Sequence, residues 1–592
     1  MGRTRRAARA PLGWCLGLLW VCTAQAQFAT PNEPPRTPSV VPRPAELAPP
    51  RIDPPSQVQL PVVPSEVPRE LGKPDDDVRI DIERYVVDDS APPALKARLA
   101  ALTKDFVGKN RSFEDLFNAR AEVTRFLQSE LGYYLGYAYV PEQTFRDGVV
   151  RIAVLEGRLD KLVLKWPADK TLPVRREVVQ AYLDRLKEGS ILLVRDVERV
   201  VFLVNDLRGI KTRFEVQAGS RPGTADIVVT PEAESIWSGK AEADINGSRF
   251  LGEYRLGGLV QMSSPFGRGD GLTANALVST PQGLAFGLLG YTTPAGSDGI
   301  KLGASLSAVK YQLDKEVFPL DLNGTAVTFT GFGLYPVFRS RNLNLFAVAS
   351  AEHKTYEDRQ SAADSKSRKS VDTLALGATG DFRDALLGGG VNTYDFTLTS
   401  GRVNYPDGRP GGLEDAPNFT KLTFGFSRLQ DLLFIMPTML GKRSGKMLAY
   451  LSLRGQLAND NLDTTEQFRL GGAEGVRAFA TGEGTGDEGM VLSLEARLLP
   501  PESWFGRISN ELVLSAFVDT GFVRYRHKLS PATTRALSNS GSFTGVGLGV
   551  SWVRPQEYAL RLSLSTPVSG EPRSDPLVRK PRLYLLATKF FK

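Results

Sequence analysis

The chain has very little cysteine and histidine. Its 592 residues include two cysteines, Cys15 and Cys22, and two histidines, His353 and His527. Both cysteines lie in the first 26 residues, so the rest of the chain can form neither a disulfide framework nor a cysteine metal site. The two histidines are far apart in the sequence, and no metal-ligand spacing joins them. We therefore expect no metal site and no cofactor.

A long apolar run is also missing. After the N-terminal segment, no stretch reaches the roughly 20 consecutive apolar residues that a membrane-spanning helix needs. The first 26 residues, MGRTRRAARAPLGWCLGLLWVCTAQA, have a basic start, a short apolar core from Pro11 to Cys22 and small residues at Ala24 and Ala26. This arrangement is typical of a secretory signal peptide. We therefore predict that residues 1–26 are a signal peptide and that the mature chain is exported.

A strong excess of one charge is absent as well. The formal net charge is +7, and four of the arginines lie in the predicted signal peptide, so +3 remains when these four are removed. This is too little to indicate a nucleic-acid partner.

The sequence offers no convincing catalytic motif. There is no G-x-S-x-G elbow, and GKRSGK, Gly441 to Lys446, is one residue short of a phosphate loop. GEGTGDEG, Gly482 to Gly489, imitates a dinucleotide fingerprint but lacks a preceding βαβ unit. We therefore expect that the protein is not an enzyme.

Proline dominates the segment that follows the signal peptide. Residues 27–74 contain 14 prolines and no apolar periodicity, so this segment can neither form a helix nor bury a core. We predict a periplasmic linker, stiff and extended at about 3.1 Å per residue.

Two units of about 75 residues follow, each predicted to be a small sheet covered by two helices. In the first, residues 75–158, apolar and charged residues alternate from Val78 to Glu83, a helix begins near Ala94, and Ser112 with Asp115 can cap a second helix through Leu131. A further strand is predicted at Val149 to Leu155.

The second unit, residues 159–235, repeats this order. It has a strand near Leu162, a helix near residues 174–186, an amphipathic helix from Arg195 to Leu207 and strands near Phe214 and Ile227.

Two stretches of these units resemble the paired POTRA modules of the TpsB two-partner secretion transporters, the haemolysin-activator and adhesin-exporting proteins of the POTRA-barrel outer-membrane superfamily. The stretches are YAYVPEQTFRDGVVRIAVLEGRLDKLVL, residues 137–164, and LVRDVERVVFLVNDLRGIKTRFEVQAGSRPGTADIVV, residues 193–229. The resemblance rests on the joint order of Pro141, Gln143, Gly148, Glu156 and Gly157 in the first module and of Glu198, Arg199, Asn205, Asp206 and Gly209 in the second.

From Ile236 to Lys592 the sequence alternates with period two, as at Leu560, Leu562 and Leu564. In an exported chain this pattern indicates a transmembrane β-barrel, apolar outward and polar inward, although a soluble β-sandwich or propeller alternates too. The resemblance favours the barrel and implies 16 strands. The predicted fold is thus α+β POTRA modules followed by an antiparallel transmembrane β-barrel.

One stretch breaks the strand pattern: FRLGGAEGVRAFATGEGTGDEGM, residues 468–490. Glycine-rich polar runs are commonly turns, in which an arginine is a solvated charge. By resemblance, however, this stretch is a long extracellular loop that folds back into the barrel, with an arginine at its tip. The tip would be Val476, Arg477, Ala478 and Phe479.

The resemblance also implies a partner for Arg477 on the barrel wall, in the motif AFVDTG that contains Asp519 and Gly521. Alternation from Leu512 to Val518 places Asp519 inward, where its carboxylate can accept two hydrogen bonds from the guanidinium. Ala478 departs from the family's pattern, which usually has glycine there. If that backbone requires a positive φ, alanine costs about 1 to 2 kcal/mol.

The resemblance implies a transporter in the outer membrane of a Gram-negative bacterium, with its POTRA modules in the periplasm. It would bind an unfolded TpsA-type partner protein (an adhesin, cytolysin or toxin) and pass it through the barrel by type V secretion. Outer-membrane lipid and, during biogenesis, the barrel-assembly machinery are the other expected partners. An outer-membrane barrel-assembly and insertion factor is the alternative, and a passive porin is a third.

Overall fold

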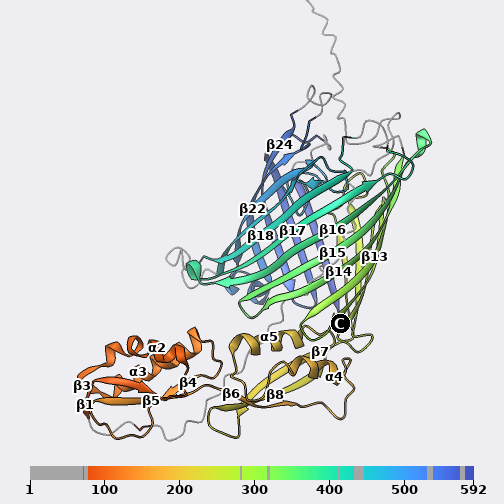
Figure 1. Ribbon diagram of the computed structural model, residues 1–592. Coiled ribbons are helices and arrows are strands. Elements are labelled where there is room, and N and C mark those ends of the chain that lie inside the picture. The colour runs from red at the N-terminus through yellow and green to blue at the C-terminus, as the bar shows by residue number, and fades with distance from the viewer. Residues whose placement is uncertain are drawn as a thin grey trace, which may run out of the picture.

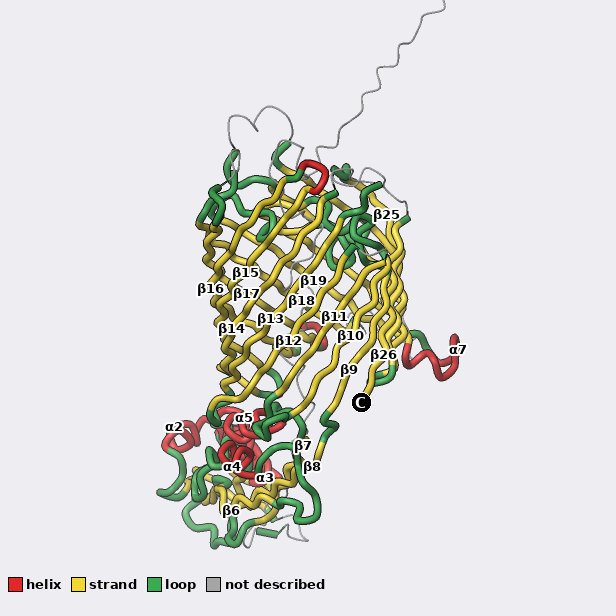
Figure 2. Tube along the Cα trace, turned by 90° about the vertical axis from the view of Figure 1, so that its right-hand side faces the viewer, coloured by secondary structure: helices red, strands yellow, loops and turns green. Residues whose placement is uncertain are grey.

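We describe the protein from a computed structural model. The described residues are 71–72, 78–280, 283–316, 321–409, 414–432, 446–529, 538–573 and 581–592. The predicted signal peptide, nearly all of the proline-rich segment and most of Gly441 to Lys446 lie outside them. Figures 1 and 2 show two small α/β modules below one end of a large barrel. None of the helices in these ranges is long and apolar enough to cross a membrane.

The first module has five strands in two sheets, where a single small sheet was expected. Strands β1 and β2 are consecutive but pair with different partners, so the order is β1-β3 in one sheet and β2-β5-β4 in the other. The elements are β1 (Arg79–Ile82), β2 (Arg84–Val87), α2 (Pro93–Leu102), η1 (Lys104–Phe106), β3 (Gly108–Ser112), α3 (Phe113–Arg125), η2 (Phe126–Glu130), β4 (Tyr137–Tyr139) and β5 (Val149–Leu155).

Helix α3 begins at the predicted capping box. The Ser112 hydroxyl accepts a hydrogen bond from the Asp115 backbone N–H, and the Asp115 carboxylate accepts one from the Ser112 N–H. These bonds satisfy two donors that the first turn leaves unpaired. Leu116, Ala119 and Val123 then bury one face of the helix. The helix was expected to run through Leu131, but α3 ends at Arg125 and continues as the π-helical turn η2.

The second module matches the predicted order of a sheet and two helices. Its sheet has the order β6-β8-β7, and α5 buries Val197, Val200, Val201 and Val204 as its amphipathic pattern predicts. The elements are β6 (Arg158–Leu164), α4 (Arg176–Leu183), α5 (Val194–Asn205), β7 (Ile210–Ala218) and β8 (Thr224–Ala233).

The barrel is antiparallel and closed, and the order of strands in its sheet confirms the sixteen that were expected. Closure is completed where the last strand pairs with the first, for example Phe591 with Gly239. The strands are β9 (Trp237–Asp244), β10 (Tyr254–Ser263), β11 (Gly271–Thr280), β12 (Leu284–Ala295), β13 (Ile300–Gln312), β14 (Leu322–Arg339), β15 (Leu343–Gln360), β16 (Ser365–Asp384), β17 (Gly390–Asn404), β18 (Asn418–Asp431), β19 (Lys446–Ala458), β22 (Glu488–Leu499), β23 (Leu512–Arg524), β24 (Ser540–Arg554), β25 (Tyr558–Ser569) and β26 (Arg582–Phe591).

Alternation along these strands separates an apolar outside from a polar inside. Outward side chains such as Leu374, Leu376 and Leu548 are at least 60% exposed on the isolated chain, as the lipid-facing side of a barrel requires. Alternate positions turn polar groups inward. Phe346, an apolar residue on the otherwise polar side of β15, lies near the end of the barrel that faces the modules, where its ring centroid is 5.8 Å from the Arg339 guanidinium.

The second module packs against one end of the barrel, the end expected to face the periplasm, through α5 (Figure 1). Asp206 directly follows this helix, and its two carboxylate oxygens accept hydrogen bonds of 2.9 and 2.7 Å from Arg339 at the end of β14. Arg199 of the helix donates to two backbone oxygens of the barrel, that of Val337 on β14 and that of Asp298 in the turn between β12 and β13. The Glu198 carboxylate accepts a hydrogen bond from the Arg341 N–H at 3.3 Å. Contacts with the barrel are therefore made by three residues that carried the resemblance: Glu198, Arg199 and Asp206.

Candidate functional site

The loop between β19 and β22 folds into the lumen. Its strands β20 (Phe468–Arg469) and β21 (Thr485–Gly486) pair with each other as a short hairpin. An isolated bridge between Gly471 and Val476 then turns the chain toward the tip. Apolar side chains of the loop and of the inner wall form one buried cluster: Phe468, Leu470, Val476, Ala478, Phe479, Val491, Val523 and Phe543. The glycine-rich segment is therefore a packed element of the lumen.

Arg477 and Asp519 form a bidentate pair inside the barrel. Arg477 Nε donates to Asp519 Oδ2 at 2.8 Å, and Nη2 donates to Oδ1 at 2.8 Å. The Arg477 backbone N–H adds a third bond to Oδ2 at 3.1 Å. The side chains are 16% and 1% exposed. Removal of one member of such a buried pair costs about 3 to 5 kcal/mol, because the other charge stays desolvated.

Other wall residues complete the arginine's surroundings. Ser493 lies directly opposite Asp519 in the sheet, accepts from Arg477 Nη2 at 3.1 Å and donates to Asp519 Oδ1 at 2.6 Å. Glu495 is 3.8 Å from Arg477 Nη1. The Phe517 ring lies under the guanidinium, with 3.2 Å from Cζ to the ring centroid. The guanidinium thus meets two carboxylates, a hydroxyl and an aromatic face.

The rest of the tip is held by its main chain and by packing. Ser565 donates to the Arg477 carbonyl at 2.8 Å, and Tyr584 donates to the Phe479 carbonyl at 3.0 Å. The rings of Phe479 and Phe543 meet edge to face at 4.6 Å. Three strands of the wall, β24, β25 and β26, therefore grip the tip in addition to β23.

Ala478 lies at the tip without a left-handed backbone, because it is not among the residues with a positive φ. The strain that alanine would suffer in that conformation is therefore absent. Its methyl group instead needs space on the wall: a Cβ built at Gly545 would lie 2.3 Å from the Ala478 Cβ. Gly521 makes similar room, since a Cβ there would lie 2.4 Å from Leu470 Cδ1 and 3.2 Å from Val476 Cγ2.

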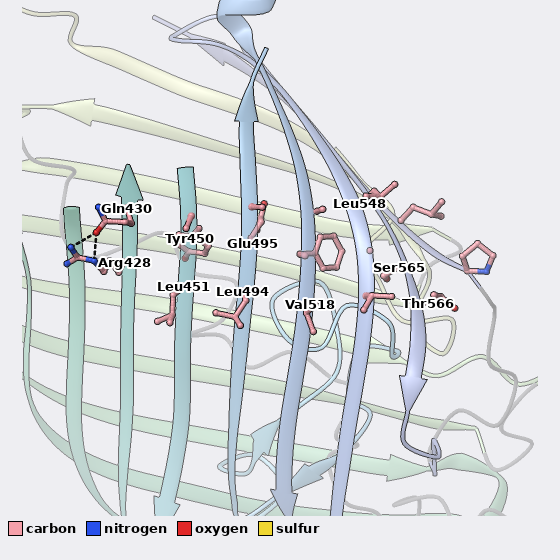
Figure 3. Close-up of a pocket in the computed structure, with 18 residues that line it drawn as sticks. Arg428, Gln430, Tyr450, Leu451, Leu494, Glu495, Val518, Leu548, Ser565 and Thr566 are labelled. Atoms are coloured by element: carbon pink, nitrogen blue, oxygen red, sulfur yellow. Dashed lines mark hydrogen bonds between the residues drawn. The ribbon is translucent and has the colours of Figure 1, made fainter. Parts of the chain in front are cut away.

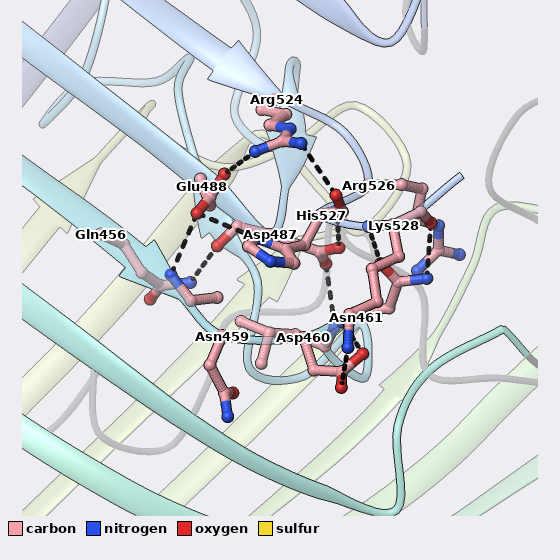
Figure 4. A network of polar contacts seen from close by, with 12 residues as sticks. Gln456, Asn459, Asp460, Asn461, Asp487, Glu488, Arg524, Arg526, His527 and Lys528 are labelled. Carbon is pink, nitrogen blue, oxygen red and sulfur yellow. Dashed lines mark hydrogen bonds and ion pairs between the residues drawn. The ribbon is translucent and has the colours of Figure 1, made fainter.

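A polar network ties the base of the loop to the connection after β23 (Figure 4). Asp487, 0% exposed, accepts from Gln467 Nε2 at 2.8 Å and from the backbone N–H groups of Leu462 and His527. Asn461 exchanges two hydrogen bonds with the Lys528 backbone. While the loop is in the lumen, these hydrogen bonds hold both of its ends at the end of the barrel away from the α/β modules.

The histidines have separate ion-pair partners. His527 Nδ1 is 3.2 Å from Glu488, and His353 Nδ1 is 2.6 Å from Asp372. Within the described ranges, histidine, aspartate and glutamate form no group of three that could hold a metal ion.

A cavity of about 840 Å³ adjoins the Arg477 pair along the wall from β18 to β25. Three of its lining residues, Glu495, Phe517 and Ser565, contact Arg477 or its carbonyl. Figure 3 shows Glu495 and Ser565 among these lining residues. The arginine is therefore fixed from one side while space remains beside it.

The structure brings together all six residues singled out in the sequence: Val476, Arg477, Ala478, Phe479, Asp519 and Gly521. Sequence reasoning missed Ser493, Glu495, Gly545, Ser565 and Tyr584. Inward alternation on β22 could have suggested Ser493 and Glu495, but their pairing with β23 depends on register, which alternation alone does not fix.

Comparison with known proteins gives family matches over most of the chain. Residues 223–552 match the model described as haemolysin secretion/activation protein ShlB/FhaC/HecB, and residues 80–157 match the POTRA domain, ShlB-type.

Curated relatives and a solved structure agree with these matches. The chain is 24% identical over 492 residues to the heme/hemopexin transporter protein HuxB of Haemophilus influenzae (strain 86-028NP), covering 82% of this chain and 83% of the relative. It is 25% identical over 466 residues to the outer membrane transporter CdiB of Dickeya dadantii (strain 3937), covering 77% and 78%. The structure of CdiB from Escherichia coli superposes with a TM-score of 0.66 at 19% identity, covering 89% of this chain and 94% of that one.

Proposed function

Because the chain belongs to the ShlB/FhaC/HecB family of haemolysin secretion and activation proteins, we propose that it exports one large TpsA-type partner, an adhesin, cytolysin or toxin, as an unfolded chain. The protein is a two-partner secretion transporter of the outer membrane, with its POTRA modules in the periplasm. Export requires that the partner is recognised and that the lumen opens.

Recognition is assigned to the sheet edges of the POTRA modules. In the second module, β6 and β7 each pair with β8 among the described strands. The outer side of β6 bonds Gly189 and Ser190 at Leu159, so β7 and the rest of β6 each have one side without a strand neighbour. An extended peptide can add to such an edge through main-chain hydrogen bonds. Residues before the first module already contact it near β4, since the Leu71 N–H donates to the Val140 carbonyl at 2.9 Å. An edge of this kind suits an unfolded partner better than a folded one.

Passage is assigned to the barrel lumen, and one observation carries this assignment: the loop tip lies inside the barrel and is held on Asp519 by Arg477. The ion pair and hydrogen bonds that hold the tip can exchange partners, whereas the strands of the closed barrel stay paired with each other. We expect the tip to leave the wall during transport. Folding of the partner outside would then withdraw unfolded chain from the pore, so the role requires no nucleotide and no catalytic step.

Two further partners follow from the same role. The apolar outer face, with Leu374 and Leu548 at 60% and 65% exposure, would contact outer-membrane lipid. The barrel-assembly machinery would insert the chain, whose last strand, β26, ends at the aromatic Phe591, followed by Lys592. A second function, insertion of other barrels, would use the same sheet edges on nascent strands.

The test is to express the full chain with a large exported β-helical protein encoded beside its gene. Partner in the medium only when the chain is present supports secretion. Partner retained in the periplasm, together with loss of other outer-membrane barrels when the chain is deleted, would support the insertion factor instead.

A further inference from the structure

Three lysines of the barrel wall point into the lumen on the side away from Asp519. Lys354 lies on β15, Lys369 on β16 and Lys421 on β18. Their side chains are 11%, 5% and 7% exposed. Lysine is seldom buried unless it is paired, because desolvation of an ammonium group is costly. A cluster of three therefore needs counter-charges.

The counter-charges come mainly from the loop. Glu466 receives Lys354 at 2.9 Å on one carboxylate oxygen and Lys421 at 2.8 Å on the other. Asp463 receives Lys369 at 2.8 Å on each of its oxygens. The loop carboxylates are 3% and 6% exposed. The wall contributes Glu352, 3.0 Å from Lys354.

Hydrogen bonds and apolar packing hold the loop segment against these lysines. Lys421 also donates to the Glu466 carbonyl at 2.8 Å, and the Tyr356 ring lies 5.2 Å from Lys369 Nζ. Leu462, one residue before Asp463, packs into a buried apolar cluster of wall residues that includes Tyr356. The loop segment from Leu462 to Glu466 thus fits the lysines through its carboxylates, its backbone and an apolar side chain.

The two contacts of the loop lie on different sectors of the wall and have opposite polarity. Arg477 meets wall carboxylates on β22 and β23, whereas Glu466 and Asp463 meet wall lysines on β15 to β18. If the loop leaves, one sector keeps its anionic groups and the other keeps three ammonium groups, with wall carboxylates near two of them: Glu352 lies 3.0 Å from Lys354, and Asp358 interacts electrostatically with Lys369.

We propose that Lys354, Lys369 and Lys421 form a carboxylate-binding site for an extended polypeptide in transit, which Glu466 and Asp463 fill while the loop is in place. The inference rests on the proposed function, since it names the chemistry of the passing chain: carboxylate side chains of an unfolded protein. Exchange of one carboxylate for another conserves the charge-assisted hydrogen bonds. The lysines then never stay desolvated and unpaired, which lowers the free-energy cost of loop release.

The test uses the full mature chain in planar lipid bilayers, with an oligoglutamate peptide added on the periplasmic side. The double variant Asp463→Asn/Glu466→Gln releases the lysines. A second variant carries Lys369→Gln and Lys421→Gln in addition. We expect oligoglutamate to block the current of the first variant at a lower concentration than it needs to block the current of the second. The ratio of the two concentrations should be about tenfold for each lysine that the second variant lacks. Glu474→Gln, on the exposed part of the same loop, should behave like the unaltered chain.

Equal block of both variants by oligoglutamate, or equal block of the first by oligolysine, would overturn the proposal. Heat-modifiable migration on gels verifies that each barrel is folded. If the double variant does not assemble, Asp463→Asn alone exposes Lys369, and its block is compared with that of Asp463→Asn/Lys369→Gln. The current measurement requires no partner protein, so it tests the lysine site separately from secretion. If oligoglutamate blocks the current as expected but the chain secretes no partner, the proposed function is wrong and the carboxylate-binding site is still supported.

Discussion

Arg339 at the periplasmic end of β14 holds Asp206 at the end of α5 in a bidentate pair, with 2.9 and 2.7 Å between donor and acceptor atoms. The Arg339 side chain is 3% exposed and lies 4.9 Å from the Phe202 ring centroid. A further bond of 2.9 Å runs to Asn344 on the next strand. The second POTRA module is thereby fixed to the barrel by a buried charge pair.

Arg339→Ala should loosen this module from the barrel, because it leaves the largely buried Asp206 carboxylate without its guanidinium partner. The loss should weaken the packing of the module on the barrel by about 3 kcal/mol. Spin labels on cysteines introduced at the exposed Lys187 and Glu557 should give a broader distance distribution. Arg213→Ala, which removes a surface arginine with a 65% exposed side chain, is the matched control. An unchanged distribution in Arg339→Ala would contradict the role of the pair.

Arg477→Ala and Asp519→Ala should each lower secretion while the barrel still assembles. Both break the same interaction, so the double variant should be little worse than either single, whereas independent sites would add. The measurement compares partner in the medium with barrel in the outer membrane. Glu474→Ala provides an exposed control on the same loop. Additive losses, or a harmless Arg477→Ala, would mean that the lumen pair has no role in transport.

The Arg477-to-Asp519 charge swap is a weaker test. Arg477→Asp with Asp519→Arg can fail even when the pairing is right, because an aspartate is too short to replace the guanidinium fork.

Gly545→Val should displace the loop tip, because a Cβ at this position would lie 2.3 Å from the Ala478 Cβ. We expect a secretion loss comparable to that of Arg477→Ala. Ala478→Gly, by contrast, removes only a methyl group from a residue without positive φ, and should cost about 1 kcal/mol or less through backbone entropy. If Gly545→Val secretes normally, the packing of the tip against β24 is not needed.

A fragment of residues 75–235 should fold alone and bind the unfolded N-terminal segment of the partner but not the folded partner. Each module has its own buried core, and strand addition requires an extended ligand. Circular dichroism checks folding, and titration with both forms of the partner checks binding. Binding to nascent barrel proteins instead would favour the insertion factor.

The sequence by itself determined the elements and their faces. The Ser112 capping box, the apolar face of α5 and the inward direction of Asp519 all follow from local chemistry or from a period of two or 3.6 residues, which a single segment expresses. The pairing of Arg477 with Asp519 was suggested by resemblance, since no local pattern joins a loop to a strand more than forty residues away.

Only the tertiary structure decided which residues meet. Closure of the barrel brings Lys354, Lys369 and Lys421 against Glu466 and Asp463, and brings Ser493 opposite Asp519. Strand register and closure are set by the summed pairing of sixteen strands, so a one-residue shift would exchange inward and outward side chains without altering the pattern in any one segment. For the same reason, the sequence alone does not distinguish Arg339 from other residues at strand ends, because its role depends on the packing of α5 over it.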